Sequence, residues 1–357
     1  MLTPPLARNL EAAVRDLDSP RAATRVSSIA DLVRHAESGP AVRTRALPLL
    51  EKALSSDTAS EVRAAAAVAL GDLGAHEALS AVLVAVEDAD LHVRQMALNA
   101  LGEIGDVRAL PRLRRALGDS RPEVRYQGVI AFCRVSKEDD DTLAALERAS
   151  ADDDAAVRYI ALRIAEERID GLVRKAPLGA GAGVFPWNRL VPRAEKLLRD
   201  PARQVGVVAA IFLAKMGHES GHPVIARVVR GQLRADKEDE REAVEVAGEI
   251  GLRDLVPDLE RRAWGAAKWL RDTCAFHAKI ALGRLGHPRA VAEITRDMGS
   301  PKRETRCAAV VAAGRAHLFE LRETIAALPD GAIDADLRSD ALHRLAPEMK
   351  PSRGPYG

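Results

Sequence analysis

Aromatic residues are scarce in this chain of 357 residues: they make up 3% of it, although 47% of the residues are hydrophobic. The apolar content is therefore mostly Ala, Leu and Val, which suits closely packed helices better than sheets. A net charge is also lacking, since 53 basic residues face 52 acidic ones. A formal charge of +1 excludes a global field that would collect nucleic acid or an anionic membrane. We expect an all-α fold in which any charge-driven binding is local.

Cysteines and long apolar runs are equally sparse. Cys133, Cys274 and Cys307 are odd in number and far apart, which excludes a disulfide framework and a closed zinc site. The first residues show no basic stretch followed by an apolar one, and no run approaches the roughly 18 apolar residues of a membrane helix. We therefore expect a cytoplasmic protein with no membrane insertion, no metal and no cofactor.

A repeated unit is what the sequence does contain. "DTASEVRAAAAVALGDLG" from Asp57 recurs as "DADLHVRQMALNALGEIG" from Asp88 and "DSRPEVRYQGVIAFCRVS" from Asp119, each 31 residues after the last, and again from Asp152. A fixed period in this range is typical of a stacked solenoid, in which each unit buries its apolar face against its neighbours.

Each unit predicts two antiparallel helices, of which the second begins near the Val-Arg pair. In the unit from Asp57, Val62, Ala66 and Ala69 share one face at helical spacing, and the small Ala side chains allow neighbouring helices to approach closely. Gly71 and Gly74 are expected to end this helix.

The pattern D-x5-V-R-x2-A-x2-A-L-G-x-[LI]-G resembles the HEAT family, in particular the short bacterial repeats known from phycobilisome-lyase-type proteins. The pattern weakens after the fourth copy, where Gly206 and Ala275 replace the Arg, and Arg306 restores it. The resemblance implies an α-solenoid, a superhelix of about ten helical hairpins. The expected organisation is HEAT-like repeats at 1–170, a Gly-rich inserted loop at 171–189, degenerate repeats at 190–346 and a flexible tail at 347–357.

The resemblance also implies a structural ladder between neighbouring units. Its expected members are Asp57 with Arg63, Asp88 with Arg94, Asp119 with Arg125, and Asp152 with Arg158. An Asp at a helix start accepts hydrogen bonds from unpaired N–H groups, and an Arg offers several fixed donors that can bridge to the next Asp. An anion-binding row of arginines is the alternative, which we disfavour because each Arg has a matched Asp.

The stretch "PLGAGAGVFPWN" looks like a glycine-rich phosphate loop but lacks the preceding strand and the Gly-Lys-Ser/Thr that such a loop needs. It falls between a helix expected to end near Glu167 and one expected to begin near Leu190. Gly179, Gly181 and Gly183 would supply a flexible loop. Phe185 and Trp187 would either dock this loop on the stack or contact a partner.

The stretch "HESGH" matches the zinc-protease pattern, whose chemistry requires His218 and His222 on one helical face with Glu219 as base. Gly221 and Pro223 interrupt such a helix, and other units have turns at this place. We therefore expect a turn and no catalytic zinc. No catalytic residues are legible elsewhere in the sequence.

The second helices also predict an exposed face. Positions equivalent to Ala64 and Val68 point away from the core face at about 100° per residue. Two of the three tyrosines, Tyr126 and Tyr159, fall at the same position in adjacent units, and Tyr is a common interface anchor. The expected partner-binding residues are Tyr126, Tyr159, Ile130, Gln95, Asn99, Arg163, Val207, Ile211 and Trp187. Burial of this face by curvature or by the inserted loop, or a register error in the degenerate units, is the alternative.

These observations favour a non-enzymatic scaffold or adaptor that binds a protein or peptide on a concave helical surface. One alternative is an enzyme subunit similar to chromophore lyases, although no tetrapyrrole site is legible. Another is nucleic-acid binding, as in HEAT-like DNA glycosylases. The basic residues that would serve it are Arg163, Lys215, Arg241, Arg284 and Arg315, but Glu103, Glu245 and Glu249 share the same surface.

Overall fold

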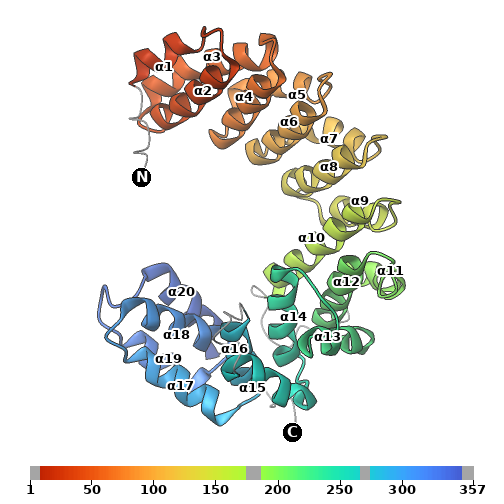
Figure 1. The fold of residues 1–357 in the computed structure, drawn as a ribbon, viewed down its shortest axis with the longest axis vertical. Helices are drawn as coiled ribbons and strands as arrows, with labels where there is room; N and C mark the ends of the chain where they lie inside the picture. The colour runs from red at the N-terminus through yellow and green to blue at the C-terminus, as the bar shows by residue number, and fades with distance from the viewer. Residues whose placement is uncertain (1–8, 174–185, 266–273, 348–357) are drawn as a thin grey trace. The chain divides into compact units, whose positions relative to one another are not determined.

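The protein is described by a computed structural model that covers residues 9–173, 186–265 and 274–347. The described residues form α-helices and short 3₁₀ turns, without a β-strand, so the predicted all-α class is confirmed (Figure 1). The chain divides into two compact units, Met1–Ile164 and Ala165–Gly357. Within the described ranges, none of the helices combines the length and the apolar character that crossing a membrane requires.

Twenty α-helices occur among the described residues, and they pair in order along the chain into ten hairpins. Unit 1 contains α1 (Leu10–Asp16), α2 (Ala22–Ala36), α3 (Pro40–Ser56), α4 (Ser60–Asp72), α5 (Leu79–Ala85), α6 (Leu91–Ile104), α7 (Leu110–Ala116), α8 (Pro122–Val135), α9 (Asp139–Ala149) and the first part of α10 (Ala155–Val173). Unit 2 contains the end of α10, α11 (Val191–Leu197), α12 (Arg203–Lys215), α13 (His222–Val229), α14 (Lys237–Glu249), α15 (Val256–Trp264), α16 (Ala275–Arg284), α17 (Pro288–Met298), α18 (Arg303–Arg315), α19 (Arg322–Ala326) and α20 (Ala335–Arg344).

Apolar side chains at helical spacing place the core between the helices. The valine that opens each second helix is buried in α4, α6, α8 and α10, as Val62, Val93, Val124 and Val157. In unit 2 the core continues through α12, α13, α14 and α16 in one cluster, and through α17, α18 and α20 in another. Within each unit the second helices of neighbouring hairpins therefore pack side by side, from α2 to α8 in unit 1 and from α12 to α20 in unit 2, with the first helices on the other side of the layer (Figure 1).

Glycine permits the close approach of these second helices. A Cβ atom on Gly71 of α4 would lie 2.9 Å from the Cα atom of Ala100 in α6, and one on Gly102 of α6 would lie 3.1 Å from the Cα atom of Ala131 in α8. In unit 2 a Cβ atom on Gly248 would lie 2.5 Å from the Cα atom of Ala281. The expectation that Gly71 ends its helix is therefore wrong, because Gly71 lies inside α4 and makes room for the next helix.

Gly74 does end its hairpin helix as predicted, with a φ of +54° that L side chains rarely adopt. Gly105 and Gly286 follow α6 and α16 with the same left-handed conformation. At the equivalent place after α18 stands His317, with a φ of 53°, the one non-glycine residue with positive φ in the described part of the chain.

The predicted loop at 171–189 lies largely outside the described residues, which include none of Gly179, Gly181, Gly183 and Phe185. The preceding helix does not end near Glu167, because α10 continues to Val173. Residues 186–190 form a 3₁₀ turn that leads into α11. The end of the predicted tail, 348–357, also lies outside the described residues.

Candidate functional site

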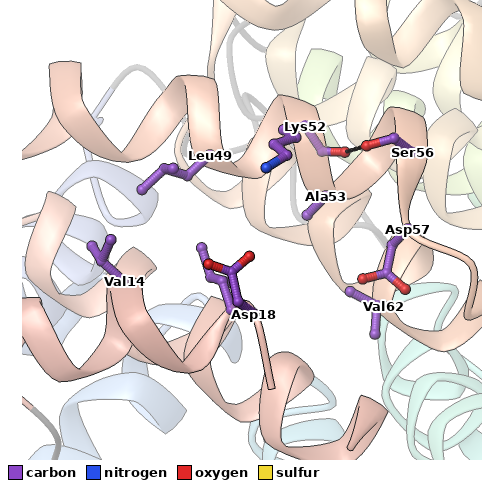
Figure 2. Close-up of a pocket in the computed structure, with 9 residues that line it drawn as sticks. Val14, Asp18, Leu49, Lys52, Ala53, Ser56, Asp57 and Val62 are labelled. Carbon is purple, nitrogen blue, oxygen red and sulfur yellow. Dashed lines mark hydrogen bonds between the residues drawn. The ribbon is translucent and has the colours of Figure 1, made fainter. Parts of the chain in front are cut away.

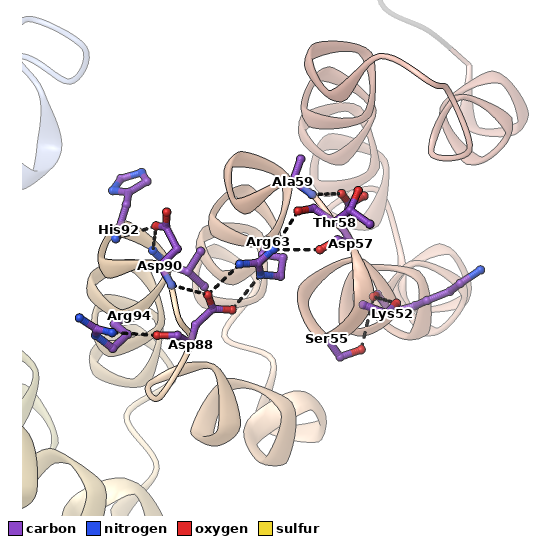
Figure 3. Close-up of polar contacts among 12 residues, drawn as sticks. Lys52, Ser55, Asp57, Thr58, Ala59, Arg63, Asp88, Asp90, His92 and Arg94 are labelled. Carbon is purple, nitrogen blue, oxygen red and sulfur yellow. Dashed lines mark hydrogen bonds and ion pairs between the residues drawn. The ribbon is translucent and has the colours of Figure 1, made fainter.

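The predicted ladder exists in unit 1, with side-chain rungs that join one repeat to the next (Figure 3). Arg63 donates from Nε and Nη2 to the two carboxylate oxygens of Asp88, both at 2.8 Å. Arg125 binds Asp152 in the same way, with both distances 2.7 Å. Such bidentate pairs fix direction as well as charge. The ladder side chains thus stabilise the contact between repeats.

The six-residue spacing between Asp and Arg within one repeat reflects a hydrogen bond to the main chain of the Asp, and not a pairing of the two side chains. Nη1 of Arg63 donates to the main-chain oxygen of Asp57 at 2.9 Å, and Arg158 does the same to Asp152 at 2.8 Å. Each Arg is therefore held by the main chain of its own repeat while its remaining donors face the next one. The main-chain contact helps to fix the orientation of the guanidinium group.

The ladder carboxylates also cap the turns before the second helices. Asp57 accepts a hydrogen bond from the main-chain N–H of Ala59 at 2.9 Å, and Asp88 accepts one from Asp90 at 2.8 Å. The hydrogen bond from Arg25 lowers the pKa of Asp57, and the one from Arg63 lowers the pKa of Asp88, although burial opposes both shifts. These carboxylates are therefore held in the charged form.

One predicted rung does not form. Arg94 donates to the main-chain oxygen of Asp88 at 2.9 Å, but its Nε atom is buried with no hydrogen-bond partner in the described structure. Asp119 instead accepts from the main-chain N–H of Arg121 at 2.8 Å. Among the described residues no ion pair links Arg94 to Asp119, so the expected rung between α6 and α8 is wrong.

The ladder also has a member that sequence reasoning missed. Arg25 of α2 donates from Nε and Nη2 to Asp57, both at 2.7 Å, and from Nη1 to the main-chain oxygen of Ser19 at 2.8 Å. Its local sequence, "ATRVSS", inverts the Val-Arg order of the later repeats. The 31-residue spacing would not have found it, because Arg25 lies 38 residues before Arg63; what it shares with the later members is the position six residues after the residue whose main-chain oxygen it binds.

The six predicted partner-binding residues of unit 1 lie on α6, α8 and α10. They are Gln95, Asn99, Tyr126, Ile130, Tyr159 and Arg163, and we call their surface the tyrosine face. All six are half-buried, so each retains some accessible surface.

The tyrosine face combines fixed polar groups with apolar area. Nε2 of Gln127 donates to Oδ1 of Asn99 at 3.3 Å, which links α8 to α6. Burial raises the pKa of the Tyr126 phenol, so its hydroxyl group stays protonated and keeps a proton to donate. The tyrosine face thus places a fixed amide group of α6 and a protonated phenol of α8 on the same surface as the apolar side chain of Ile130.

The predicted extension of this surface into unit 2 is wrong. Val207 and Ile211 are buried in α12 within the core that α12 shares with α13 and α14. Every residue from Val205 to Ala214 is buried, because this helix is apolar around its whole circumference. A helix of this kind has no exposed face to offer.

Trp187 lies in the 3₁₀ turn before α11 and is 1% exposed. This agrees with docking of that segment on the stack and contradicts the assignment of Trp187 as a partner contact. Its Nε1 atom is buried without a hydrogen-bond partner in the described structure.

The "HESGH" stretch forms the predicted turn. His218 precedes the 3₁₀ turn Glu219–Gly221, and His222 begins α13 after it. A Cβ atom on Gly221 would lie 2.5 Å from the main-chain oxygen of Ala210, so this turn packs tightly on α12. In the described part of the chain no three His, Cys, Asp or Glu side chains gather as a metal site would require.

Two of the basic residues considered for nucleic-acid binding, Lys215 and Arg315, form ion pairs within unit 2. Lys215 is 5% exposed and pairs with Glu166 and Glu242, the latter at 2.5 Å. Nη2 of Arg315 lies 2.7 Å from a carboxylate oxygen of Glu245, which is itself 5% exposed. Lys215 is therefore a buried structural cation, whereas Arg284 and Arg315 keep accessible surface.

A small pocket of about 220 Å³ lies between α1, α3 and α4 (Figure 2). Asp18, Lys52 and Asp57 contribute its polar lining, and Val14 and Leu49 part of its apolar lining. Asp57 is already held by Arg25. The pocket is smaller than the roughly 300 to 1,000 Å³ of ordinary ligand sites, and it does not suggest an active site.

Comparison with known proteins supports the repeat architecture. Residues 47–133 match a family model described as HEAT repeats. No curated protein matches the chain by sequence. Among solved structures, YibA of E. coli is 18% identical, with a TM-score of 0.52 over 78% of this chain and 93% of YibA. At this identity the match shows the fold alone.

Two further structures align less well. The complex of CpcE and CpcF of phycocyanin lyase from Nostoc sp. PCC7120 is 19% identical, with a TM-score of 0.42 over 70% of this chain and 90% of that one. A designed armadillo repeat protein in complex with the peptide (KR)4 is 21% identical, with a TM-score of 0.41 over 58% of this chain and 100% of that one. These scores are too low to support an argument about function. The helix pairs and the ladder, with the family match over residues 47–133, show HEAT-like repeats in that region and an α-solenoid fold for the chain.

Proposed function

We propose that this protein is a non-enzymatic scaffold of the cytoplasm that binds a protein or peptide partner on the tyrosine face. The observation that carries the proposal is the placement of Tyr126 and Tyr159 at equivalent positions on α8 and α10, both half-buried. A half-buried Tyr is held in place by its own fold and still exposes part of a large amphipathic side chain to a partner.

The neighbouring side chains suit the same role. Ile130 adds apolar area next to Tyr126 on α8, and Asn99 with its hydrogen bond from Gln127 provides a positioned polar group. Interfaces commonly combine an apolar centre with a polar rim. An extended or helical segment could place two apolar side chains against the two tyrosines, since packed helices are about 8–10 Å apart.

The test is capture of partners by the full-length protein with both tyrosines replaced. We expect Tyr126→Ala with Tyr159→Ala to lose a partner that the wild type retains, with at least about a thirtyfold loss of affinity, because truncating a buried anchor costs about 2 kcal/mol or more. The matched control is Val84→Ala on α5, which removes an exposed apolar side chain that is 72% accessible and lies off the tyrosine face.

Thermal unfolding of the same variants separates binding from folding. Retention of the partner by a double variant that melts like the wild type would contradict the proposal. A lowered melting temperature with unchanged partner affinity would assign both tyrosines to the core instead.

A further inference from the structure

Three arginines occupy one repeated position at the ends of successive second helices in unit 2. Arg284, Arg315 and Arg344 are the last residues of α16, α18 and α20. These helix ends are neighbours, because a Cβ atom on Gly283 would lie 3.1 Å from Cβ of Ala316, and one on Gly314 would lie 3.0 Å from Cα of Ala341. The C-terminal end of a helix favours a cation, which makes each position suitable for Arg by itself.

The same position in unit 1 carries opposite charges. Glu103 of α6 and Arg134 of α8 form an ion pair there. The stem of Arg134 crosses Gly102, whose Cβ atom would lie 3.5 Å from Cδ of Arg134. Arg344 crosses Gly314 at the same 3.5 Å. The position next to Arg134 in the preceding repeat is therefore the carboxylate Glu103, whereas the position next to Arg344 in the preceding repeat is another cation, Arg315.

The carboxylates of unit 2 form ion pairs with two of these three arginines. Arg315 pairs with Glu245 at 2.7 Å, and Arg344 pairs with Asp340 of its own helix at 2.7 Å. Arg284 makes one hydrogen bond, from Nη1 to the main-chain oxygen of Arg315 at 3.3 Å, and no carboxylate of the described residues lies within ion-pair distance of it.

The surroundings of Arg284 make its charge costly. Burial lowers the pKa of the Arg284 guanidinium, and the charge of Arg344 lowers it further, while Glu249 and Glu245 raise it. An anion from outside would relieve this cost, because it would place opposite charge within hydrogen-bond distance of the guanidinium, which Glu249 and Glu245 do not.

His317 adds a second observation at the same place. It adopts the left-handed conformation that glycine supplies after α4, α6 and α16, which is strained for a residue with a side chain. Burial, with the charges of Arg284 and Arg344, lowers the pKa of His317 to about 3. Its ring is therefore neutral at physiological pH and can donate one hydrogen bond without adding charge.

We propose that Arg284, Arg315, Arg344 and His317 form a binding row for the carboxylates of an acidic peptide segment. The row is separate from the tyrosine face and does not depend on its role. An extended peptide rises about 3.3 Å per residue, so a carboxylate at every third residue matches the roughly 8–10 Å between packed helices. Because Glu245 and Asp340 border the row, a ligand must place its negative charges at the arginines and not between them, which separately spaced peptide carboxylates allow and a continuous phosphate backbone does not.

The test is fluorescence anisotropy with the full chain and a labelled Gly/Ser peptide that carries Glu at every third residue. We expect this peptide to bind and the same peptide with Gln in place of Glu not to bind. Arg284→Gln should weaken binding about tenfold, as expected for the loss of one charged hydrogen-bond partner, whereas Arg284→Lys should retain part of the affinity. The matched control is Arg134→Gln, which changes the same repeat position in unit 1 and should leave the affinity unchanged.

A second variant keeps the test decisive if Arg284→Gln is unstable. His317→Gly relieves the backbone strain, so it should weaken peptide binding without lowering the melting temperature. The proposal is overturned if the wild type does not bind the Glu peptide, or if Arg134→Gln weakens binding as much as Arg284→Gln. Tighter binding of single-stranded DNA than of the Glu peptide would likewise overturn it, in favour of a nucleic-acid site.

Discussion

The two units of this protein share their packing but differ in the polar groups that join their repeats. In unit 1 Arg25, Arg63 and Arg125 form bidentate rungs to aspartates of the next repeat. In unit 2 the equivalent Arg306 donates instead to the main-chain oxygen of Ala332, from Nε at 3.1 Å and from Nη2 at 2.9 Å. Neighbouring repeats can therefore be linked either by an Arg–Asp ion pair or by hydrogen bonds from an Arg to a main-chain oxygen.

What remains the same is the contact between second helices. Gly71 lies against Ala100 in unit 1, and Gly248 lies against Ala281 in unit 2, in each case with no room for a Cβ atom. Apolar burial and close approach thus maintain the stack in both units, while the polar links adapt to local sequence. The comparison teaches that loss of the Asp-Arg pattern after the fourth copy does not mean loss of the fold.

The largest expected effect comes from the buried cation of unit 2. Lys215→Met should lower the free energy of unfolding by about 3–5 kcal/mol, because it leaves the buried carboxylate of Glu166 without this partner. Chemical denaturation of the full chain measures the change. The control is Arg134→Met, whose ion pair is 47% and 43% exposed and should contribute no more than about 1 kcal/mol. Equal losses of unfolding free energy in the two variants would contradict the claim that buried ion pairs contribute more to stability than exposed ones.

A smaller effect is expected from overpacking the contact that both units share. Gly248→Ala should destabilise the protein by about 1–3 kcal/mol, because the new Cβ atom would lie 2.8 Å from the main-chain oxygen of Ala281. Gly39→Ala is the matched control, since a Cβ atom there meets nothing within 4 Å. Thermal melts of both variants check this, and a neutral Gly248→Ala would show that close helix contact is not what maintains unit 2.

Acid should weaken unit 1 through its rungs. The pKa values of Asp57 and Asp88 are lowered from 3.8 in the folded state, so these groups add stability above that pH. This stability is lost as the pH falls below 3.8 and through the folded-state values. Hydrogen exchange of the α4 and α6 amides across this range measures it. Arg63→Gln should reduce the acid sensitivity, and an unchanged profile in that variant would assign the effect to other carboxylates.

The sequence predicts the fold well because its signal is periodic and repeated. Val62, Val93 and Val124 define the buried face, and Asp57 and Asp88 mark the turn before each second helix. The class, the paired helices and two of the rungs follow from these positions. Periodic burial is local information, so each copy of the motif reports it again.

The candidate site is predicted less completely, because it depends on which neighbours cover a residue. Val207 is at the position of Ala64, and the structure buries both. The larger side chains at this position, Tyr126 and Tyr159, are half-buried instead. Whether a position contributes surface thus depends on side-chain size and on the packing of the next hairpin, neither of which the repeat spacing reports.

The most direct test of the ladder is a pair of double-mutant cycles at two positions with the same motif. Arg125 reaches Asp152 with two hydrogen bonds, whereas Arg94 makes none to Asp119. Denaturant unfolding of Arg125→Ala, Asp152→Ala and the double variant should give a coupling energy of about 1 kcal/mol or more. The same cycle at Arg94 and Asp119 should give a coupling near zero. Equal couplings in the two cycles would contradict the claim that the side-chain rung, and not the motif alone, links the repeats.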